Sequence, residues 1–158
     1  MMTTLNEIQK FLYPKKVAIA GASRNSKKFG GIVFKELKEK GFRLYPVNPN
    51  AVEIQGVKSY NSIESLPGDV QHLYIVTPRA ETEFIAKAAV KKGMKMIWIQ
   101  QKSDTPEAVK AIEEANIPLI HKKCILMFAD PVKAPHNVHR FFAKLFGAYP
   151  KIVAHSEN

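Results

Sequence analysis

The sequence predicts a doubly wound α/β fold, built as one domain around a parallel sheet. From Lys16 onward, short apolar runs alternate with segments that have helical spacing of apolar residues. Strands separated by helices pair in parallel through right-handed crossovers, which gives this class of fold. The length of 158 residues also fits one domain, because chains usually form one unit per ~100–200 residues. We therefore treat residues 1–158 as a single domain.

The individual elements follow from the same periodicity and from the turn residues between them. Strands are predicted where apolar runs end at glycine, proline or asparagine signals, over residues 17–20, 42–47, 70–76, 94–99 and 117–120. Helices are predicted where apolar residues recur at helical spacing, over residues 5–12, 30–40, 81–92 and 105–115. Gly41 and Gly93 end two of them, and Thr105 caps another with Pro106 in its first turn. The connection between residues 47 and 70 is expected to be irregular.

A further helix is predicted at the C-terminal end, over about residues 134–147. Its apolar stripe consists of Val138, Phe141, Phe142 and Leu145. We expect this stripe to dock onto its own domain, and the alternative is a homodimer interface. His136 and His139 lie three residues apart in the same helix, but two ligands without a carboxylate or thiolate make a poor metal site. No metal is therefore predicted.

Composition bounds the classes of protein that fit this chain. The 24 Lys and Arg residues against 14 Asp and Glu attract polyanions, but the basic residues form scattered pairs, which disfavours a nucleic-acid-binding role. The apolar runs are shorter than the ~20 residues of a membrane span, and the N-terminal segment lacks the order of a signal peptide. A cytoplasmic address follows. The lone Cys124 makes neither an intramolecular disulfide nor a zinc site, and we expect it to be buried and structural.

The segment after the first predicted strand, residues 21–31, has the features of a phosphate-binding loop. In doubly wound folds, ligands bind beyond the carboxyl ends of the strands. Gly21 allows a tight turn, small or hydroxylated residues follow it, and a helix then begins whose positive end favours an anion. The spacing excludes the P-loop of nucleoside triphosphatases. It also disfavours NAD, because Ser23 replaces a glycine and the second strand ends without an acidic residue.

Four ordered segments resemble the small stand-alone CoA-binding proteins, whose domain is Rossmann-like and similar to the N-terminal domain of the succinyl-CoA synthetase α subunit. They are residues 17–23, 45–49 and 56–63 and the position of Cys124, within a family-like core of about residues 13–127. The resemblance implies a CoA site, with the first loop on the phosphates and the adenosine end between the loops after the second and third strands. The residues that it implies are Gly21, Ala22, Ser23, Lys28, Asn48, Pro49, Val76, Thr77, Pro78, Ile99 and Gln100.

The chain also departs from this family. The synthetase relatives carry a basic residue after the second-strand proline, where this chain has residues 50–52, Asn-Ala-Val. We therefore expect dephospho-CoA, which lacks the 3′-phosphate, to bind nearly as well as CoA. The synthetase also uses a second domain with a phosphorylated histidine, so its ligase chemistry is not carried over.

The hypothesis from sequence is a cytoplasmic, non-catalytic module that binds CoA or an acyl-CoA. No carboxylate pair and no serine with a base stand at the predicted strand ends, so no catalytic residue is assigned. Two alternatives stay open: an NAD(P)-dependent oxidoreductase and a nucleotide-sensing or nucleic-acid-associated regulator. The first lacks the acidic ribose ligand, and the second lacks a helix-turn-helix beside the ligand domain.

Overall fold

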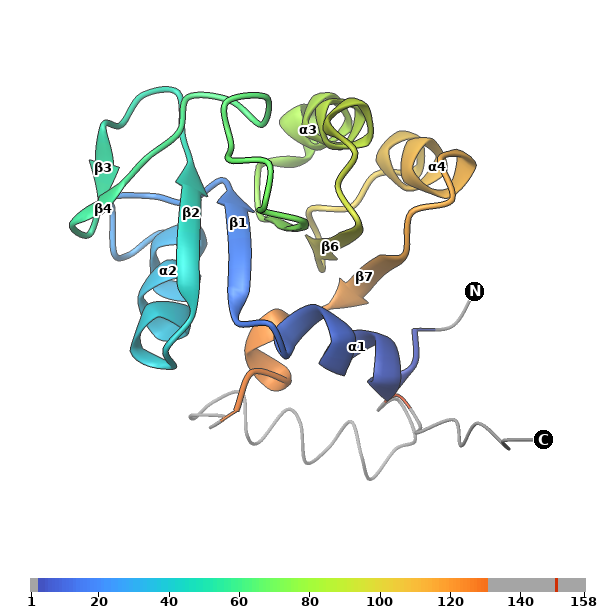
Figure 1. Cartoon of the computed structure of the whole chain (residues 1–158), viewed down its shortest axis with the longest axis horizontal. Helices are drawn as coiled ribbons and strands as arrows, with labels where there is room; N and C mark the ends of the chain where they lie inside the picture. Colours follow the sequence, from blue (N-terminus) through green and yellow to red (C-terminus); the bar gives the residue numbers. More distant parts are fainter. Residues whose placement is uncertain (1–2, 131–149, 151–158) are drawn as a thin grey trace.

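The computed structural model describes residues 3–130 and residue 150. Its elements are, in chain order, α1 (Leu5–Leu12), β1 (Lys16–Ala20), α2 (Phe29–Glu39), β2 (Arg43–Val47), β3 (Glu53–Ile54), β4 (Val57–Lys58), β5 (His72–Ile75), α3 (Arg79–Lys92), β6 (Met96–Gln100), α4 (Pro106–Glu114), β7 (Leu119–Lys123) and a 3-10 turn at Ile125–Met127 (Figure 1). The predicted α/β class with a parallel sheet is confirmed.

The main sheet has five parallel strands in the order β2-β1-β5-β6-β7. The chain therefore leaves β1 toward one edge, forms β2 there, and crosses back to place β5 on the other side of β1. This reversal is the topological switch point, which lies between the carboxyl ends of β1 and β5. In such sheets, the switch point leaves a crevice between the loops that diverge from the two strands.

Helices cover both faces of the sheet, and alternate residues of β1 show how. Val17 and Ile19 belong to the core shared with α1, α2 and the 3-10 turn, whereas Ala18 and Ala20 belong to the core shared with α3 and α4. All four side chains are at most 1% exposed. A strand buried on both faces reads as a continuous apolar run, which is why the sequence made β1 easy to identify.

The helix ends follow local capping chemistry. Thr4 and Glu7 form a capping box at the start of α1. The Thr4 hydroxyl accepts the Glu7 N–H, and the Glu7 carboxylate accepts the Thr4 N–H. Thr105 accepts the Ala108 N–H at 3.2 Å, and Pro106 stands in the first turn of α4 as predicted. Gly93 ends α3 with φ 78°, the left-handed conformation that favours glycine.

The larger differences from the prediction concern α3, β7 and the connection between β2 and β5, and the bounds of the other elements lie within two residues of the predicted ones. Helix α3 begins at Arg79, two positions before the predicted start, because Pro78 serves as its N-cap and not as a separate turn. Strand β7 runs over Leu119–Lys123 rather than 117–120, since an edge strand tolerates charged residues such as Lys122 and Lys123. The connection between β2 and β5 contains the hairpin β3–β4, which turns at Gln55 and Gly56 with φ of 49° and 77°.

The predicted C-terminal helix at 134–147, with His136, His139 and the stripe of apolar residues, lies outside the described residues. Its docking, and the alternative of a homodimer, stay predictions. Within residues 3–130, no helix is both long enough and apolar enough to cross a membrane.

Candidate functional site

A large cleft opens at the switch point, beyond the carboxyl ends of β1, β2, β5 and β6. Its volume is about 1150 Å³, which exceeds the ~300–1,000 Å³ of most small-molecule sites and suits an elongated ligand. Ten of the eleven residues that the sequence assigned to a ligand site line it, which is all of them except Ile99. Ile99 is fully buried in the core between β6 and the α3–α4 layer.

The glycines of the first loop allow a close approach of backbone segments. Gly21 has φ 92°, and a Cβ there would lie 2.7 Å from the carbonyl carbon of Val76 and 2.8 Å from the Thr77 nitrogen. A Cβ on Gly30 would collide with the Gly21 carbonyl oxygen. From the sequence, Gly21 is predicted to allow a tight turn after the first strand. In the structure, the absence of a side chain at Gly21 also lets the chain after β1 pack against the chain after β5, the exits of these two strands, and both segments line the cleft.

The N-terminus of α2 points two free backbone donors at this cleft. Within the described chain, the N–H groups of Phe29 and Gly30 donate to no acceptor, whereas the Gly31 N–H bonds the Lys28 carbonyl at 2.9 Å. The N-cap is Lys28, whose side chain makes no capping hydrogen bond and is exposed at the cleft. Free N–H groups, the positive end of the helix and an ammonium together form an environment that favours a phosphate.

Side-chain hydrogen bonds hold the first loop in shape. The Ser23 Oγ accepts the Asn25 N–H at 3.1 Å, and the Asn25 Oδ1 accepts the Lys27 N–H at 2.9 Å. Asn48 joins this loop to the turn after β2, because its Nδ2 donates to the Ala22 carbonyl at 3.0 Å and its Oδ1 accepts the Asn50 N–H at 2.8 Å. Asn48 was expected at the ligand, and the structure shows that its amide shapes the two loops around the cleft.

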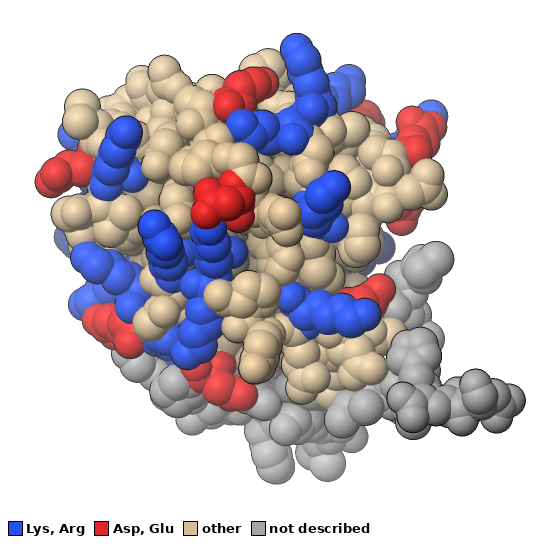
Figure 2. Space-filling model, viewed as in Figure 1, with Lys and Arg blue, Asp and Glu red and all other residues tan. Residues whose placement is uncertain are grey.

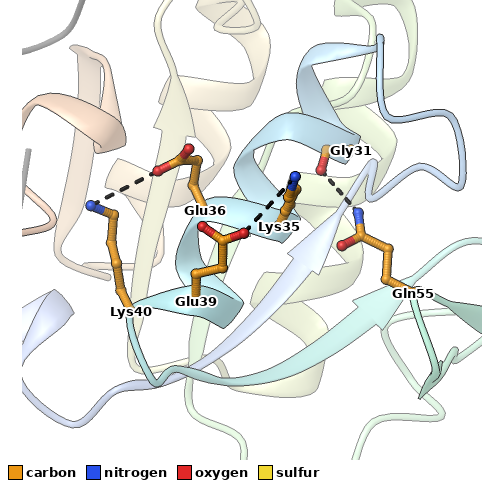
Figure 3. A network of polar contacts seen from close by, with 6 residues as sticks. All are labelled: Gly31, Lys35, Glu36, Glu39, Lys40 and Gln55. Carbon is orange, nitrogen blue, oxygen red and sulfur yellow. Dashed lines mark hydrogen bonds and ion pairs between the residues drawn. The ribbon is translucent and has the colours of Figure 1, made fainter. Parts of the chain in front are cut away.

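The hairpin β3–β4 contacts the first turn of α2. Gln55 at its turn donates from Nε2 to the Gly31 carbonyl at 3.1 Å, and Figure 3 shows this contact beside the ion pairs along α2. Those pairs join Lys35 to Glu39 at 3.9 Å and Lys40 to Glu36 at 4.0 Å. The hairpin thus fixes the first turn of α2, which carries the free donors.

The exit of β5 forms a buried polar wall of the cleft. The hydroxyls of Thr77 and Thr82 lie 3.1 Å apart, and the Thr82 hydroxyl also donates to the Pro78 carbonyl at 3.2 Å. Thr77 is 5% exposed and Thr82 is fully buried. Buried hydroxyls that satisfy each other in this way order the backbone around them, here the first turn of α3.

The exit of β6 presents an amide whose orientation is fixed from behind. The Gln100 Oε1 accepts the Tyr74 hydroxyl at 2.8 Å and the Ile125 N–H at 3.3 Å. Since a backbone N–H only donates, the atom that it meets is the oxygen, so Nε2 lies on the other side of the amide. Burial raises the pKa of Tyr74 well above its ordinary value, which keeps the hydroxyl protonated as a donor. Gln100 lines the cleft, and the contacts to Tyr74 and Ile125 engage its amide oxygen and not its Nε2.

Several residues of the cleft were not predicted from the sequence. They come from α3, the segment before β5 and the loop after β6: Asn61, Ser62, Glu64, Arg79, Phe84, Lys102 and Ser103. The start of α3 directly after Pro78 is the signal that could have placed Arg79 at this edge. Phe84 carried no such signal, because a phenylalanine in an amphipathic helix is expected in the core, whereas here it is 74% exposed.

Other candidate groups lie outside this cleft. Cys124 is buried at 3% exposure, which confirms the predicted burial. Among the residues that the structure describes, no cluster of three His, Cys, Asp or Glu could hold a metal ion. Basic and acidic side chains are interspersed over the face shown in Figure 2, which agrees with the scatter of basic residues along the sequence.

Known proteins are similar to this chain in sequence and in architecture. The family model described as a CoA binding domain matches residues 15–130. The α subunit of the ADP-forming acetate–CoA ligase II of Pyrococcus furiosus is 37% identical over 115 residues, which are 71% of this chain and 25% of that subunit. This chain thus matches only about a quarter of that curated relative's length.

Solved structures of two hypothetical proteins have the same fold. One from Pyrococcus horikoshii is 30% identical with a TM-score of 0.76, covering 82% of this chain and 92% of that chain. A conserved hypothetical protein from Pyrococcus furiosus is 40% identical with a TM-score of 0.67, covering 70% of this chain and 95% of that one. With the family model spanning most of its length, the chain belongs to the CoA-binding domain family.

Proposed function

We propose that this member of the CoA-binding domain family binds coenzyme A or an acyl-CoA in the switch-point cleft. The observation that carries the proposal is the N-terminus of α2, where two unpaired N–H groups and the Lys28 ammonium face the cleft together. The pyrophosphate of CoA is the dianion that such a helix end favours. The family membership supports CoA as the source of that pyrophosphate.

The rest of the ligand follows the length of the cleft. The adenosine end lies between the turn after β2, at Asn48 and Pro49, and the exit of β5, at Thr77 and Pro78. The pantetheine arm then extends toward the exit of β6, where the Gln100 amide offers donors for its carbonyl groups. Phe84 on α3 supplies exposed apolar surface in the same cleft.

We limit the proposal to binding in the cytoplasm, without catalysis. Among the described residues that line the cleft, there are donors, cations, apolar groups and the two carboxylates Glu64 and Glu81, with no histidine or cysteine. A ligase or transferase would need a nucleophile or an acid–base pair at the reacting carbonyl. The chemistry on offer is suited to holding an anion.

Calorimetric titration with CoA, acetyl-CoA, NADH and NADPH tests the proposal. We expect saturable one-to-one binding of CoA or acetyl-CoA and at least tenfold weaker binding of the two dinucleotides. Tighter binding of NADH than of CoA would refute the proposal and favour the oxidoreductase.

A matched pair of variants at Ser23 locates the binding site. Both Asp and Asn can accept the Asn25 N–H in place of the serine hydroxyl, so both keep the loop turn. Only Ser23→Asp adds a negative charge beside the expected pyrophosphate. We expect Ser23→Asp to weaken CoA binding by about thirtyfold or more and Ser23→Asn to stay within about threefold of the parent. Equal affinities of the two variants would place the pyrophosphate elsewhere.

A further inference from the structure

The turn after β2 lacks a cation of its own. Residues 48–52 are Asn-Pro-Asn-Ala-Val, yet in doubly wound folds the ribose of a bound nucleotide lies at the end of the second strand. A phosphate on that ribose needs a basic partner near the turn. The sequence alone therefore predicted that dephospho-CoA would bind nearly as well as CoA.

The structure brings a cation to this turn from another loop. The Arg24 guanidinium Nη2 lies 3.4 Å from the Asn50 carbonyl oxygen, although the two residues are 26 positions apart in the chain. Asn48 ties the same two loops together through its bond to the Ala22 carbonyl. The backbone that carries Arg24 is thereby fixed beside the turn that carries Asn50, which lines the cleft.

The charge of Arg24 is available to a ligand. Its side chain is exposed, and among the described residues no carboxylate lies within ion-pair distance of it. The bond to Asn50 is at the long end of the range for hydrogen bonds, so little is lost when the guanidinium turns toward a phosphate. A guanidinium can also meet a phosphate with two parallel N–H donors.

On the basis of the proposed function, we infer that Arg24 binds the ribose 3′-phosphate and makes the site selective for CoA over dephospho-CoA. The first loop then serves two parts of the ligand. Its helix end and Lys28 hold the pyrophosphate, while Arg24 holds the 3′-phosphate at the outer rim. This assignment is the opposite of the prediction from sequence that dephospho-CoA binds nearly as well as CoA.

Calorimetry with CoA and dephospho-CoA against three proteins tests the inference. They are the parent chain, Arg24→Gln, and Lys27→Gln as a control that removes an exposed charge from the same loop without touching the β2 turn. We expect the parent to prefer CoA by about tenfold, as one charge-assisted contact allows. Arg24→Gln should lose this preference through weaker CoA binding alone, and Lys27→Gln should keep it.

The outcomes separate this inference from the proposed function. If the parent binds CoA without a preference, or if Arg24→Gln weakens both ligands equally or neither, the role of Arg24 is wrong while CoA binding stands. If Lys27→Gln also abolishes the preference, general charge attraction explains it and the inference fails. If the parent binds neither ligand, the proposed function itself fails.

Discussion

The two sides of the cleft are built in different ways. On one side, the loop after β1 is exposed from Arg24 to Phe29 and carries its cations without ion pairs among the described residues. On the other side, Thr77 after β5 and Gln100 at the end of β6 are each 5% exposed and bond to Thr82 and Tyr74, although the exposed cations Arg79 and Lys102 lie in the same part of the cleft. The first side thus consists of exposed residues, whereas the second side combines exposed cations with polar groups that belong to the core.

This difference assigns separate roles to substitutions on the two sides. An exposed side chain without a protein partner contributes to the affinity for a ligand, and its loss barely changes the folded state. A buried group in a hydrogen-bonded network contributes to stability, because its removal leaves a partner unsatisfied. Changes of exposed side chains on the loop should therefore alter affinity alone, whereas changes of the buried groups on the β5–β6 side, such as Thr77 and Gln100, should alter the free energy of unfolding.

Gly21 joins the two sides, and its substitution should have the largest effect. Gly21→Ala places a Cβ against the Val76 and Thr77 backbone and keeps a φ of 92°. We expect the free energy of unfolding to fall by ~3 kcal/mol or more. The control is Gly41→Ala, where φ is 81° and nothing lies within 4 Å of the added Cβ, so only the strain of ~1 kcal/mol applies.

Urea denaturation of both variants measures this difference. Equal losses at the two positions would show that the exits of β1 and β5 are not in close contact. The more drastic Gly21→Val, which should also abolish CoA binding, is not a clean test of the ligand site, because it disturbs the packing of β1 against β5 as well.

Lys28 should show the opposite signature, a loss of affinity at constant stability. Removing its ammonium in Lys28→Ala takes away a charge-assisted contact to the pyrophosphate, for a loss of ~1–3 kcal/mol or about tenfold or more. The loss should shrink as salt is raised, since exposed charges are screened. Lys27→Ala is the matched control on the same exposed loop, and similar losses for the two variants would contradict a specific role for Lys28.

Replacing Cys124 by serine changes a buried residue with little change in the shape of the side chain. The thiol is 3% exposed beside the β6 exit, and a hydroxyl is costlier to bury than a thiol. Cys124→Ser should therefore lower the free energy of unfolding by ~1–2 kcal/mol and leave CoA affinity within about threefold. A loss of CoA binding at an unchanged melting temperature would show instead that the thiol contacts the ligand.

The sequence predicted the sheet, because strands buried on both faces, such as β1, leave continuous apolar runs. The pattern of apolar residues is weaker where a strand is buried on one side only. The edge strand β7 was therefore predicted two residues too early, and the hairpin β3–β4 was not predicted. For the site, chain order located the loops at the carboxyl ends of the strands. Chain order could not show which side chains form hydrogen bonds within the protein. Asn48 bonds the Ala22 carbonyl and the Gln100 oxygen accepts the Tyr74 hydroxyl. Arg24 contacts Asn50, which lies 26 positions further along the chain.

Amide chemical-shift mapping on addition of CoA tests the central claim most directly. The account predicts that the largest shifts occur at the Phe29 and Gly30 amides, whose N–H groups are free in the described chain, and at Thr77 across the cleft. Amides of α1, which packs on one face of the sheet through Phe11 and has no residue in the cleft, should change little. Saturating CoA that leaves Phe29 and Gly30 unshifted, or that shifts α1 most, would contradict binding at the switch-point cleft.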